Sequence, residues 1–269
     1  MQDLKIALLQ CVLQSGSPQQ NYRHLEELMK QQRVQNDLVL LPETFGTGFS
    51  ADPEHFAEER EGPGMAWMQR MAQTYQTVVC GSLLLKQGKT YSNTLVWMRP
   101  DGSYETYAKR HVFRMGGEHE YITPGNTLQT VELKGWKVRP LICYDLRFPA
   151  WCRNSYSEGV YEYDLLLFVA NWPAQRSWPW KQLLIARAIE NISCVAGLNR
   201  VGNDEQGNSY TGDSVVLDAR GIAVANATPG EETVLEARLS AAQLLDFRQK
   251  FKVALDWDRF NILHLSEGK

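Results

Sequence analysis

Residues 141–149 of this 269-residue chain read Leu-Ile-Cys-Tyr-Asp-Leu-Arg-Phe-Pro and follow an apolar run that begins at Trp136. The run predicts a buried strand, and the residues after Cys143 predict a helix that reaches about Ser157. A sharp strand-to-helix turn is where an α/β enzyme exposes a nucleophile and points backbone N–H groups at a ligand. A helix start also favours a thiolate, so we expect the pKa of Cys143 to fall below roughly 8.5. The alternative is a structural cysteine, because a thiol at the end of a buried strand commonly serves as a small core side chain.

Strand and helix patterns extend from this stretch in both directions. Roughly twelve strands with helices in two groups predict two mixed β-sheets packed face to face, with the helices outside. No linker rich in Pro, Gly or Ser divides the chain, which favours one main domain. Strands are expected at residues 4–10, 37–42, 77–85, 91–98, 104–108, 128–133, 136–143, 164–170, 193–198 and 233–239, with a hairpin at 218–221 and helices at 18–34, 63–75, 178–191 and 241–250.

The composition excludes several classes of protein. Hydrophobic residues make up 43% of the chain and charged residues 22%, which is ordinary for a globular protein. The formal net charge of −3 argues against a nucleic acid or a membrane as the main partner. The chain begins directly with a predicted strand and shows no signal-peptide pattern, so we expect a cytoplasmic protein.

The cysteines and histidines do not form a metal-binding pattern. Five cysteines are widely spaced without a Cys-x-x-Cys pair, which disfavours both a disulfide framework and a zinc site. The sequence Glu118-His119-Glu120 lacks the flanking ligands that a metal site needs. We therefore expect neither a metal nor another cofactor, and we expect the remaining thiols to be buried structural residues: Cys11, Cys80, Cys152 and Cys194.

Two further residues stand at strand ends in the same manner as Cys143. Glu43 follows an apolar strand and precedes a loop with Gly46 and Gly48, so its carboxylate is either a local loop or helix-cap partner or a catalytic base. Lys109 closes a hairpin strand and, taken alone, is a surface lysine. A cysteine nucleophile needs both a base and a positive charge, which makes the combination informative.

Three segments in this order give the chain a resemblance to the nitrilase (carbon–nitrogen hydrolase) superfamily over about residues 4–240. They are residues 41–43 (Leu-Pro-Glu), 109–113 (Lys-Arg-His-Val-Phe) and 143–149 (Cys-Tyr-Asp-Leu-Arg-Phe-Pro). The resemblance implies a four-layer α-β-β-α sandwich with a Glu–Lys–Cys triad. It also implies a hydrolase domain at residues 1–240, while residues 241–269 form a helix and a tail that pack on the domain or on a partner subunit.

The resemblance assigns a role to each residue of the triad. Glu43 is the expected base, Cys143 the nucleophile, and Lys109 with the backbone N–H of Tyr144 the oxyanion donors. A second glutamate of the family pattern matches Glu118, with Glu120 as a rival, and would orient the lysine. These are the roles expected of an amidase that passes through a thioester.

The segments at residues 170–174, 186–191 and 197–200 look closest to the omega-amidase branch, which deaminates 2-oxoglutaramate and 2-oxosuccinamate. Such a substrate carries a carboxylate opposite its amide, so the pocket needs a cation or several N–H donors. The candidate cations are Arg147, Arg176 and Arg114, although Arg147 is equally compatible with a structural ion pair. Asn171 is placed to touch the ligand, and Trp172 is either a pocket residue or a packing residue.

Other functions remain open at this point. A nitrilase, a carbamoylase or a general aliphatic amidase shares the triad, whereas a non-catalytic interaction protein would keep only the fold. A papain-like protease is excluded because its Cys–His sequence setting is missing. The resemblance also implies a homodimer that acts on a small-molecule amide and is built largely by the helices after Cys143 and after Trp178.

Overall fold

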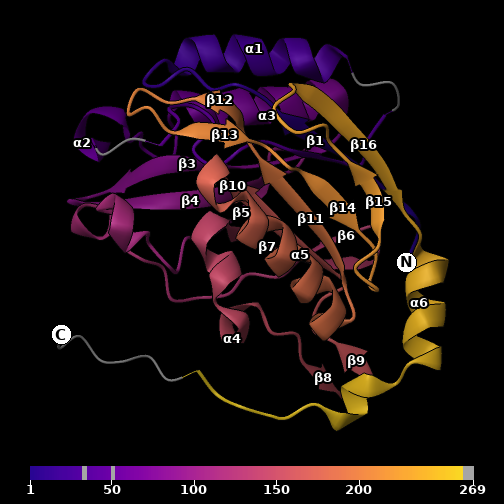
Figure 1. Ribbon diagram of the computed structural model, residues 1–269. Helices are drawn as coiled ribbons and strands as arrows, with labels where there is room; N and C mark the ends of the chain where they lie inside the picture. Colours follow the sequence, from indigo (N-terminus) through magenta and orange to yellow (C-terminus); the bar gives the residue numbers. More distant parts are fainter. Residues whose placement is uncertain (32–34, 50–51, 263–269) are drawn as a thin grey trace.

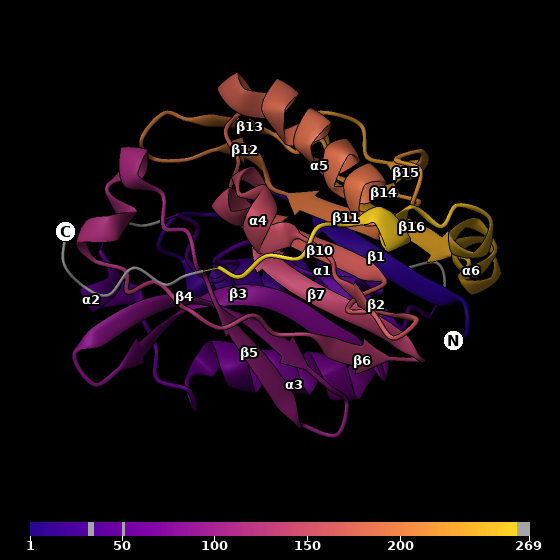
Figure 2. The same cartoon turned by 90° about the horizontal axis from the view of Figure 1, so that it is seen from below.

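The structure is a computed structural model that describes residues 1–31, 35–49 and 52–262. Within these ranges, two mixed six-stranded sheets lie between α5 on one side and α3 on the other, which confirms the expected sandwich (Figure 2). Helix α1 shares a core cluster with α3. In spatial order, the first sheet contains β16 (Thr233–Leu239), β1 (Leu4–Gln10), β2 (Leu38–Leu40), β3 (Val78–Gln87), β4 (Thr90–Met98) and β5 (Tyr104–Ala108). The second contains β15 (Ala223–Asn226), β14 (Val215–Leu217), β11 (Cys194–Asn199), β10 (Leu165–Ala170), β7 (Trp136–Ile142) and β6 (Val131–Leu133).

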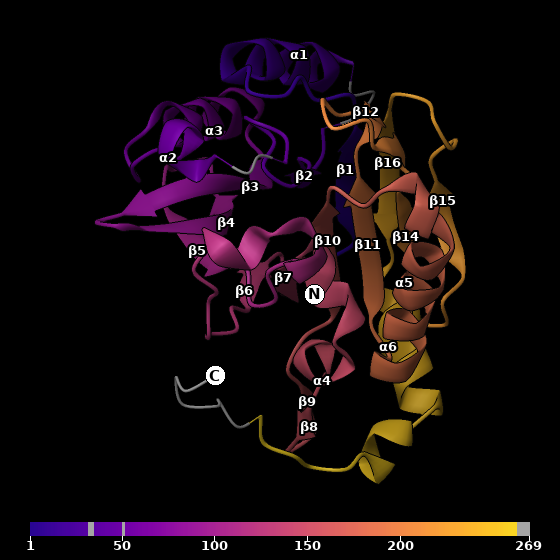
Figure 3. The ribbon, with the colours of Figure 1, turned by 60° about the vertical axis from the view of Figure 1, so that its left-hand side comes forward.

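Helices cover both outer faces, and short elements connect the layers (Figures 1 and 3). The α-helices are α1 (Pro18–Lys30), α2 (Pro53–Phe56), α3 (Pro63–Tyr75), α4 (Pro149–Cys152), α5 (Ser177–Asn191) and α6 (Ala241–Lys250). Single 3₁₀ turns occur at η1 (Arg114–Gly116), η2 (Glu118–Glu120), η3 (Cys143–Arg147), η4 (Ala174–Arg176) and η5 (Val253–Asp256). Two small ribbons, β8 (Tyr156–Ser157) with β9 (Val160–Tyr161) and β12 (Val201–Asn203) with β13 (Ser209–Thr211), bring the described strands to sixteen, above the expected twelve.

The apolar side chains of β1 show how the layers are held together. Alternate residues of a strand point to opposite faces of its sheet. Leu4, Ile6 and Leu8 belong to the core between the two sheets, whereas Ala7 and Leu9 pack with the helical layer of α1 and α3. Because both faces are apolar, the strand reads as a continuous hydrophobic run, as buried strands of α/β folds do.

Helix α5 packs closely against the second sheet. Trp180 and Leu184 are fully buried and belong to the inter-sheet core cluster. A Cβ atom at Gly197 of β11 would lie 2.5 Å from Leu184 Cδ1 and 3.1 Å from Trp180 Cζ2, so only glycine permits this approach. The close packing fixes α5, and with it the loop that precedes it, against the strand ends.

The strand directions bring four polar residues to one edge of the sandwich. Strands β1, β2 and β3 are parallel, and so are β7, β10 and β11. Strand β5 runs in the same direction as β3, because each is antiparallel to β4. The residues that follow β2, β5, β7 and β10 are therefore the ones that can converge: Glu43, Lys109, Cys143 and Asn171.

The helix expected from Cys143 to about Ser157 is wrong. The chain forms η3, then a residue in extended conformation at Phe148, and then the single-turn helix α4, which ends at Cys152. Pro149 explains the interruption, because a proline disfavours helical conformation in the residue before it but readily begins a new helix. Tyr156 and Ser157 lie instead in the β8–β9 ribbon.

The C-terminal segment packs on the same body. Helix α6 buries Ala241 and Leu244 in the inter-sheet core cluster. Farther along, Trp257 lies 4.2 Å from the Arg153 guanidinium and 5.9 Å from the Tyr161 ring. The division at residue 240 stays a prediction, and residues 263–269 of the expected tail lie outside the described ranges.

Candidate active site

Cys143 occupies a strained turn directly after β7. Its φ of 41° lies in the left-handed region, which is uncommon for a residue with a side chain. Backbone strain of this kind costs about 1–3 kcal/mol and persists only where surrounding contacts enforce it. The residue is 8% exposed and lines a small cavity. A partly accessible thiol on a strained turn is the geometry expected of a nucleophile.

Beside this thiol lies a buried cluster of one ammonium and two carboxylates. Lys109 Nζ is 2.9 Å from Glu43 Oε1 and 3.0 and 2.9 Å from the two oxygens of Glu118. All three side chains are at least 97% buried. Burial alone would lower the pKa of Lys109, but the carboxylates of Glu118 and Glu43 outweigh it and raise that pKa well above its ordinary value. Lys109 is therefore a fixed positive charge in the site.

The thiol itself is neutral in the resting site, so the expected thiolate is wrong. Burial and the neighbouring Glu43 carboxylate raise the pKa of Cys143 well above its ordinary value. The charge of Lys109 and the backbone N–H of Asn171 act in the opposite direction, but they do not prevail. A helix start lowers a thiol pKa only where the thiolate is solvated or faces a net positive charge, and this site offers neither. The nucleophile therefore needs a base in contact with it.

Glu43 is held in place by two asparagines. Asn93 Nδ2 of β4 donates to Glu43 Oε1 over 2.9 Å, and the backbone N–H of Asn171 donates to Glu43 Oε2 over 2.7 Å. The side chain of Asn171 also donates to the carbonyl oxygen of Glu43. With Lys109 on Oε1 as well, three donors orient the carboxylate, which lines the same cavity as the Cys143 thiol and raises the pKa of that thiol.

The structure separates the rival candidates. Glu118 is buried on Lys109 and also accepts the backbone N–H of Phe113 over 2.6 Å, whereas Glu120 is exposed. Arg147 and Arg176 line the cavity, and Arg114 is exposed and does not. Of the predicted site residues, those that line the cavity are Glu43, Lys109, Cys143, Tyr144, Arg147, Asn171, Trp172 and Arg176.

Both cavity arginines lie over aromatic rings. The guanidinium of Arg147 is 4.9 Å from the Trp172 ring centre, and that of Arg176 is 5.2 Å from the Phe113 ring centre. Such contacts orient a guanidinium while leaving its N–H groups free for a ligand. Trp172 combines two predicted roles, because it is 3% exposed, lines the cavity and donates its indole N–H to the Arg176 carbonyl over 2.7 Å.

Sequence reasoning missed several residues of the site. Phe49, Phe113 and Pro173 complete the cavity wall. Asn93 stands between Ser92 and Thr94 in β4, and no local sequence signal sets it apart; its burial and its partner Glu43 come from the fold. Asn199 anchors the backbone of Trp172, accepting its N–H and donating to its carbonyl over 2.8 and 2.9 Å.

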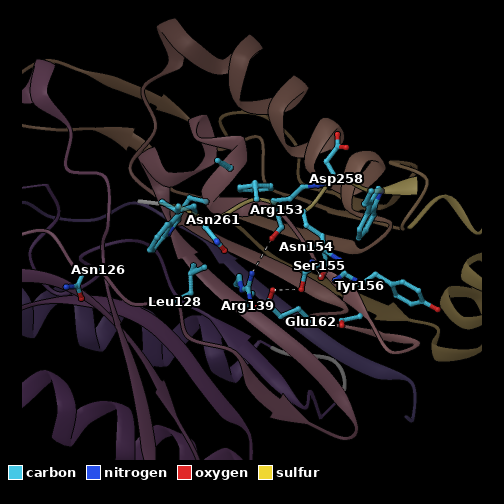
Figure 4. Close-up of a pocket in the computed structure, with 17 residues that line it drawn as sticks. Asn126, Leu128, Arg139, Arg153, Asn154, Ser155, Tyr156, Glu162, Asp258 and Asn261 are labelled. Carbon is cyan, nitrogen blue, oxygen red and sulfur yellow. Dashed lines mark hydrogen bonds and ion pairs between the residues drawn. The ribbon is translucent and has the colours of Figure 1, made fainter. Parts of the chain in front are cut away.

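A larger cavity lies away from these residues, beneath the C-terminal segment (Figure 4). Its one buried cation, among the described residues that line it, is already paired with a carboxylate. Arg139 pairs with Glu162, which also accepts the Ser155 hydroxyl over 2.9 Å. It contains no thiol and none of the predicted site residues. Across the described ranges, no group of three His, Cys, Asp or Glu side chains is arranged to hold a metal ion.

Comparisons with known proteins all point to the carbon–nitrogen hydrolases. The profile of the family described as carbon-nitrogen hydrolase matches residues 5–249. "Omega-amidase YafV" of Yersinia enterocolitica is 42% identical, over 98% of this chain and 100% of that protein. "2-oxoglutaramate amidase" of Bacillus subtilis is 31% identical over 92% and 95%. Among solved structures, XC1258 of Xanthomonas campestris is 42% identical with a TM-score of 0.95, covering 97% of this chain and 100% of that one; it is described as a CN-hydrolase superfamily protein with an arsenic adduct in the active site.

Proposed function

The chain belongs to the carbon–nitrogen hydrolase family, and from this premise we propose that it is an omega-amidase. Its reaction hydrolyses the terminal amide of a 2-oxo dicarboxylic acid monoamide, such as 2-oxoglutaramate or 2-oxosuccinamate, to the 2-oxo acid and ammonia. Relatives with these activities in their names cover nearly the whole chain.

The observation that carries the proposal is the pair of unpaired cations beside the nucleophile. Arg147 and Arg176 line the same small cavity as Cys143. Within the described residues, neither guanidinium has a carboxylate partner, and each is supported only by an aromatic ring. A cavity with free guanidinium groups and a thiol suits a substrate that carries a carboxylate at one end and an amide at the other.

The first half of the reaction follows from the contacts of Glu43. Glu43 takes the proton of the Cys143 thiol as the sulfur attacks the amide carbon, because a neutral thiol is a weak nucleophile until a base removes its proton. The carbonyl oxygen then becomes an oxyanion, which Lys109 and the backbone N–H of Tyr144 stabilise; one such donor is worth about 10²–10³-fold in rate. Glu43 passes its proton to the nitrogen, the carbon–nitrogen bond breaks, and ammonia leaves.

The second half of the reaction uses the same groups in reverse. The thioester on Cys143 is attacked by a water molecule whose proton goes to Glu43. The carbon–sulfur bond breaks, the sulfur regains the proton, and the 2-oxo acid is released. Glu118 does not touch the reacting atoms in this account; it keeps Lys109 charged and oriented through two short contacts.

A substrate panel tests the proposed function. Release of ammonia is measured from 2-oxoglutaramate, from a neutral aliphatic amide of similar length, from a nitrile and from an N-carbamoyl amino acid, at equal concentrations. The proposal requires the oxo-acid amide to be the best substrate, and Arg147→Gln and Arg176→Gln to raise its KM while affecting the neutral amide much less. A negligible rate on the oxo-acid amide beside a fast rate on another compound assigns the chain to a nitrilase, a carbamoylase or a general aliphatic amidase. Hydrolysis that persists in the Cys143→Ala variant would mean that this protein shares the fold of the amidases but not their cysteine chemistry.

We also propose a cytoplasmic homodimer that does not bind nucleic acid or membranes. All five cysteines are free, as in proteins of a reducing compartment. Ile189 of α5 and Ile222 are 50% and 61% exposed, and such apolar groups are common at subunit contacts. Among the described residues no helix has the length and apolar character to cross a membrane. Light scattering on the eluted protein tests the dimer.

A further inference from the structure

Asp145 is a fully buried carboxylate two residues after the nucleophile, and neither the triad nor the cavity includes it. Burying a carboxylate is costly unless its oxygens accept hydrogen bonds. Among the residues that the structure describes, four hydrogen-bond donors contact the Asp145 carboxylate, and none of them belongs to a Lys or Arg. Oδ2 accepts the backbone N–H of Ile142 and the hydroxyl of Tyr107, over 3.1 and 2.7 Å. Oδ1 accepts the backbone N–H and the ring Nδ1–H of His111, over 3.0 and 2.8 Å.

These four donors come from two separate segments. Ile142 immediately precedes Cys143, whereas Tyr107 and His111 stand two residues before and two residues after Lys109. One carboxylate therefore joins the turn that carries the nucleophile to both flanks of the residue that carries the positive charge. A local helix cap would explain the Ile142 contact alone, so the other three donors require a different account.

Neighbouring side chains make this connection rigid. The Tyr107 hydroxyl also accepts the indole N–H of Trp151 over 2.9 Å and the backbone N–H of Arg110 over 3.2 Å. The His111 ring stacks on Phe148 with a centroid distance of 3.6 Å. Since a carboxylate only accepts hydrogen bonds, the proton of the His111–Asp145 contact resides on Nδ1.

We propose that Asp145 is a positioning residue for the amide hydrolysis, holding the Cys143 turn and the Lys109 segment at their working separation. The proposal rests on the proposed function for its reaction, but its geometry concerns the thiol and the ammonium alone. Displacement of a catalytic group by about 1 Å can cost 10²-fold in rate. Loss of the carboxylate should therefore act on kcat more than on KM, since Asp145 does not line the substrate cavity.

Asp145→Asn is the informative variant, because it keeps the size of the side chain and replaces one acceptor oxygen with an N–H donor. Whichever way the amide turns, it faces a backbone N–H, that of Ile142 or that of His111. We expect kcat on 2-oxoglutaramate to fall about 100-fold with KM within about threefold. Alkylation of Cys143 by iodoacetamide, followed by peptide mass spectrometry, should slow about tenfold or more, since the turn no longer holds the thiol against Glu43.

Asp164→Asn is the matched control. Asp164 is also a buried aspartate that accepts a backbone N–H, that of Lys137 over 2.9 Å, but it precedes β10 while the site lies after that strand. This variant should lose stability in thermal unfolding while kcat and the Cys143 alkylation rate stay within about threefold of the wild type. Equal losses of kcat in both aspartate variants would mean a merely structural role and would overturn the proposal.

Tyr107→Phe covers the case in which Asp145→Asn fails to fold. It removes one of the four donors to Asp145, together with the acceptor of the Trp151 and Arg110 N–H groups, and keeps the carboxylate. Both kcat and Cys143 alkylation should fall about three- to tenfold, the worth of the hydrogen bond to the Asp145 carboxylate. Unchanged values in Tyr107→Phe, or a wild-type alkylation rate in folded Asp145→Asn, would contradict the proposal. If the wild type does not hydrolyse 2-oxoglutaramate, the proposed function fails, but the alkylation comparison still decides the role of Asp145.

Discussion

Two buried charged clusters lie at the opposite ends of strand β10, and only one of them has the features of an active site. After its last residue, Asn171 touches the cluster of Glu43, Lys109 and Glu118, which has two carboxylates for one ammonium and opens into a cavity. Before its first residue, Asp164 pairs with Arg248, one charge for one, and the guanidinium also binds the backbone carbonyl groups of Tyr163 and Ile192.

The two clusters differ in their net charge and in whether they open into a cavity. The Asp164–Arg248 cluster is neutral, closed by backbone groups and able to hold α6 on the body of the fold. The Glu43–Lys109–Glu118 cluster carries an excess negative charge beside a neutral thiol, which is the arrangement a proton acceptor requires. Burial alone therefore does not identify chemistry; an unbalanced cluster next to a nucleophile and a cavity does.

The largest expected effect separates the clusters by activity. Glu43→Gln removes the proton acceptor and should lower kcat about 10²–10⁴-fold, the contribution of general acid–base groups. The control is Glu120→Gln, an exposed carboxylate near Lys109 in sequence but outside the cluster, which should leave kcat unchanged. Steady-state ammonia release measures both variants. Wild-type turnover by the Glu43→Gln enzyme would contradict the assignment of Glu43 as the proton acceptor.

The second effect separates the clusters by stability. Arg248→Met strands Asp164 as an uncompensated buried charge and should cost about 3–5 kcal/mol of folding free energy. Urea denaturation measures the loss, and kcat of the folded variant should remain that of the wild type. Because Arg248 lies in α6, a large loss also means that the stable unit extends past residue 240. A loss below 1 kcal/mol would mean that the helix is dispensable.

How far these two regions could be predicted from sequence differs as well. The bounds of β1, α3 and α6 follow from apolar periodicity and helix start signals, because those patterns are local. Cys143, Glu43 and Lys109 were found through motif order. Asn93 and Asp145 were not, since the partner of Asn93 lies 50 residues away in sequence and the Tyr107 and His111 partners of Asp145 lie 38 and 34 residues away, so that only the fold brings them together. The pKa of Cys143 was predicted in the wrong direction because burial and the facing carboxylate are tertiary properties.

A smaller effect tests how Glu43 is oriented. Asn93→Ala removes one of the three donors to the Glu43 carboxylate and should lower kcat about tenfold, the worth of a hydrogen bond to a charged group. Asn208→Ala offers a comparison, because Asn208 donates to the Asp204 carboxylate over the same 2.9 Å but stands outside the cavity lining. Rate measurements in which the two variants behave alike would count against an orienting role for Asn93.

The smallest effect concerns alkaline pH. Burial raises the pKa of Cys152 and Cys194 from 9.0 to about 12. The neutral thiols are favoured in the folded state, so their contribution is complete below pH 9 and is lost as pH rises from about 9 to about 12. Each thiol should steepen the loss by at most about 1.4 kcal/mol per pH unit. Cys194→Ala should therefore show a shallower decline than the wild type in denaturation between these pH values; parallel curves would refute the assignment.

The central claim is that Cys143 attacks the amide carbon and carries the acyl group, and acid quenching during turnover tests it most directly. The protein is mixed with excess 2-oxoglutaramate, quenched in acid within the first turnovers, digested and analysed by mass spectrometry. The account predicts a mass gain of one 2-oxo-acyl group on the peptide that contains Cys143, and none on the peptides of Cys11, Cys80 or Cys194. Turnover with an acyl group on another residue, or undiminished turnover by Cys143→Ala, would contradict it.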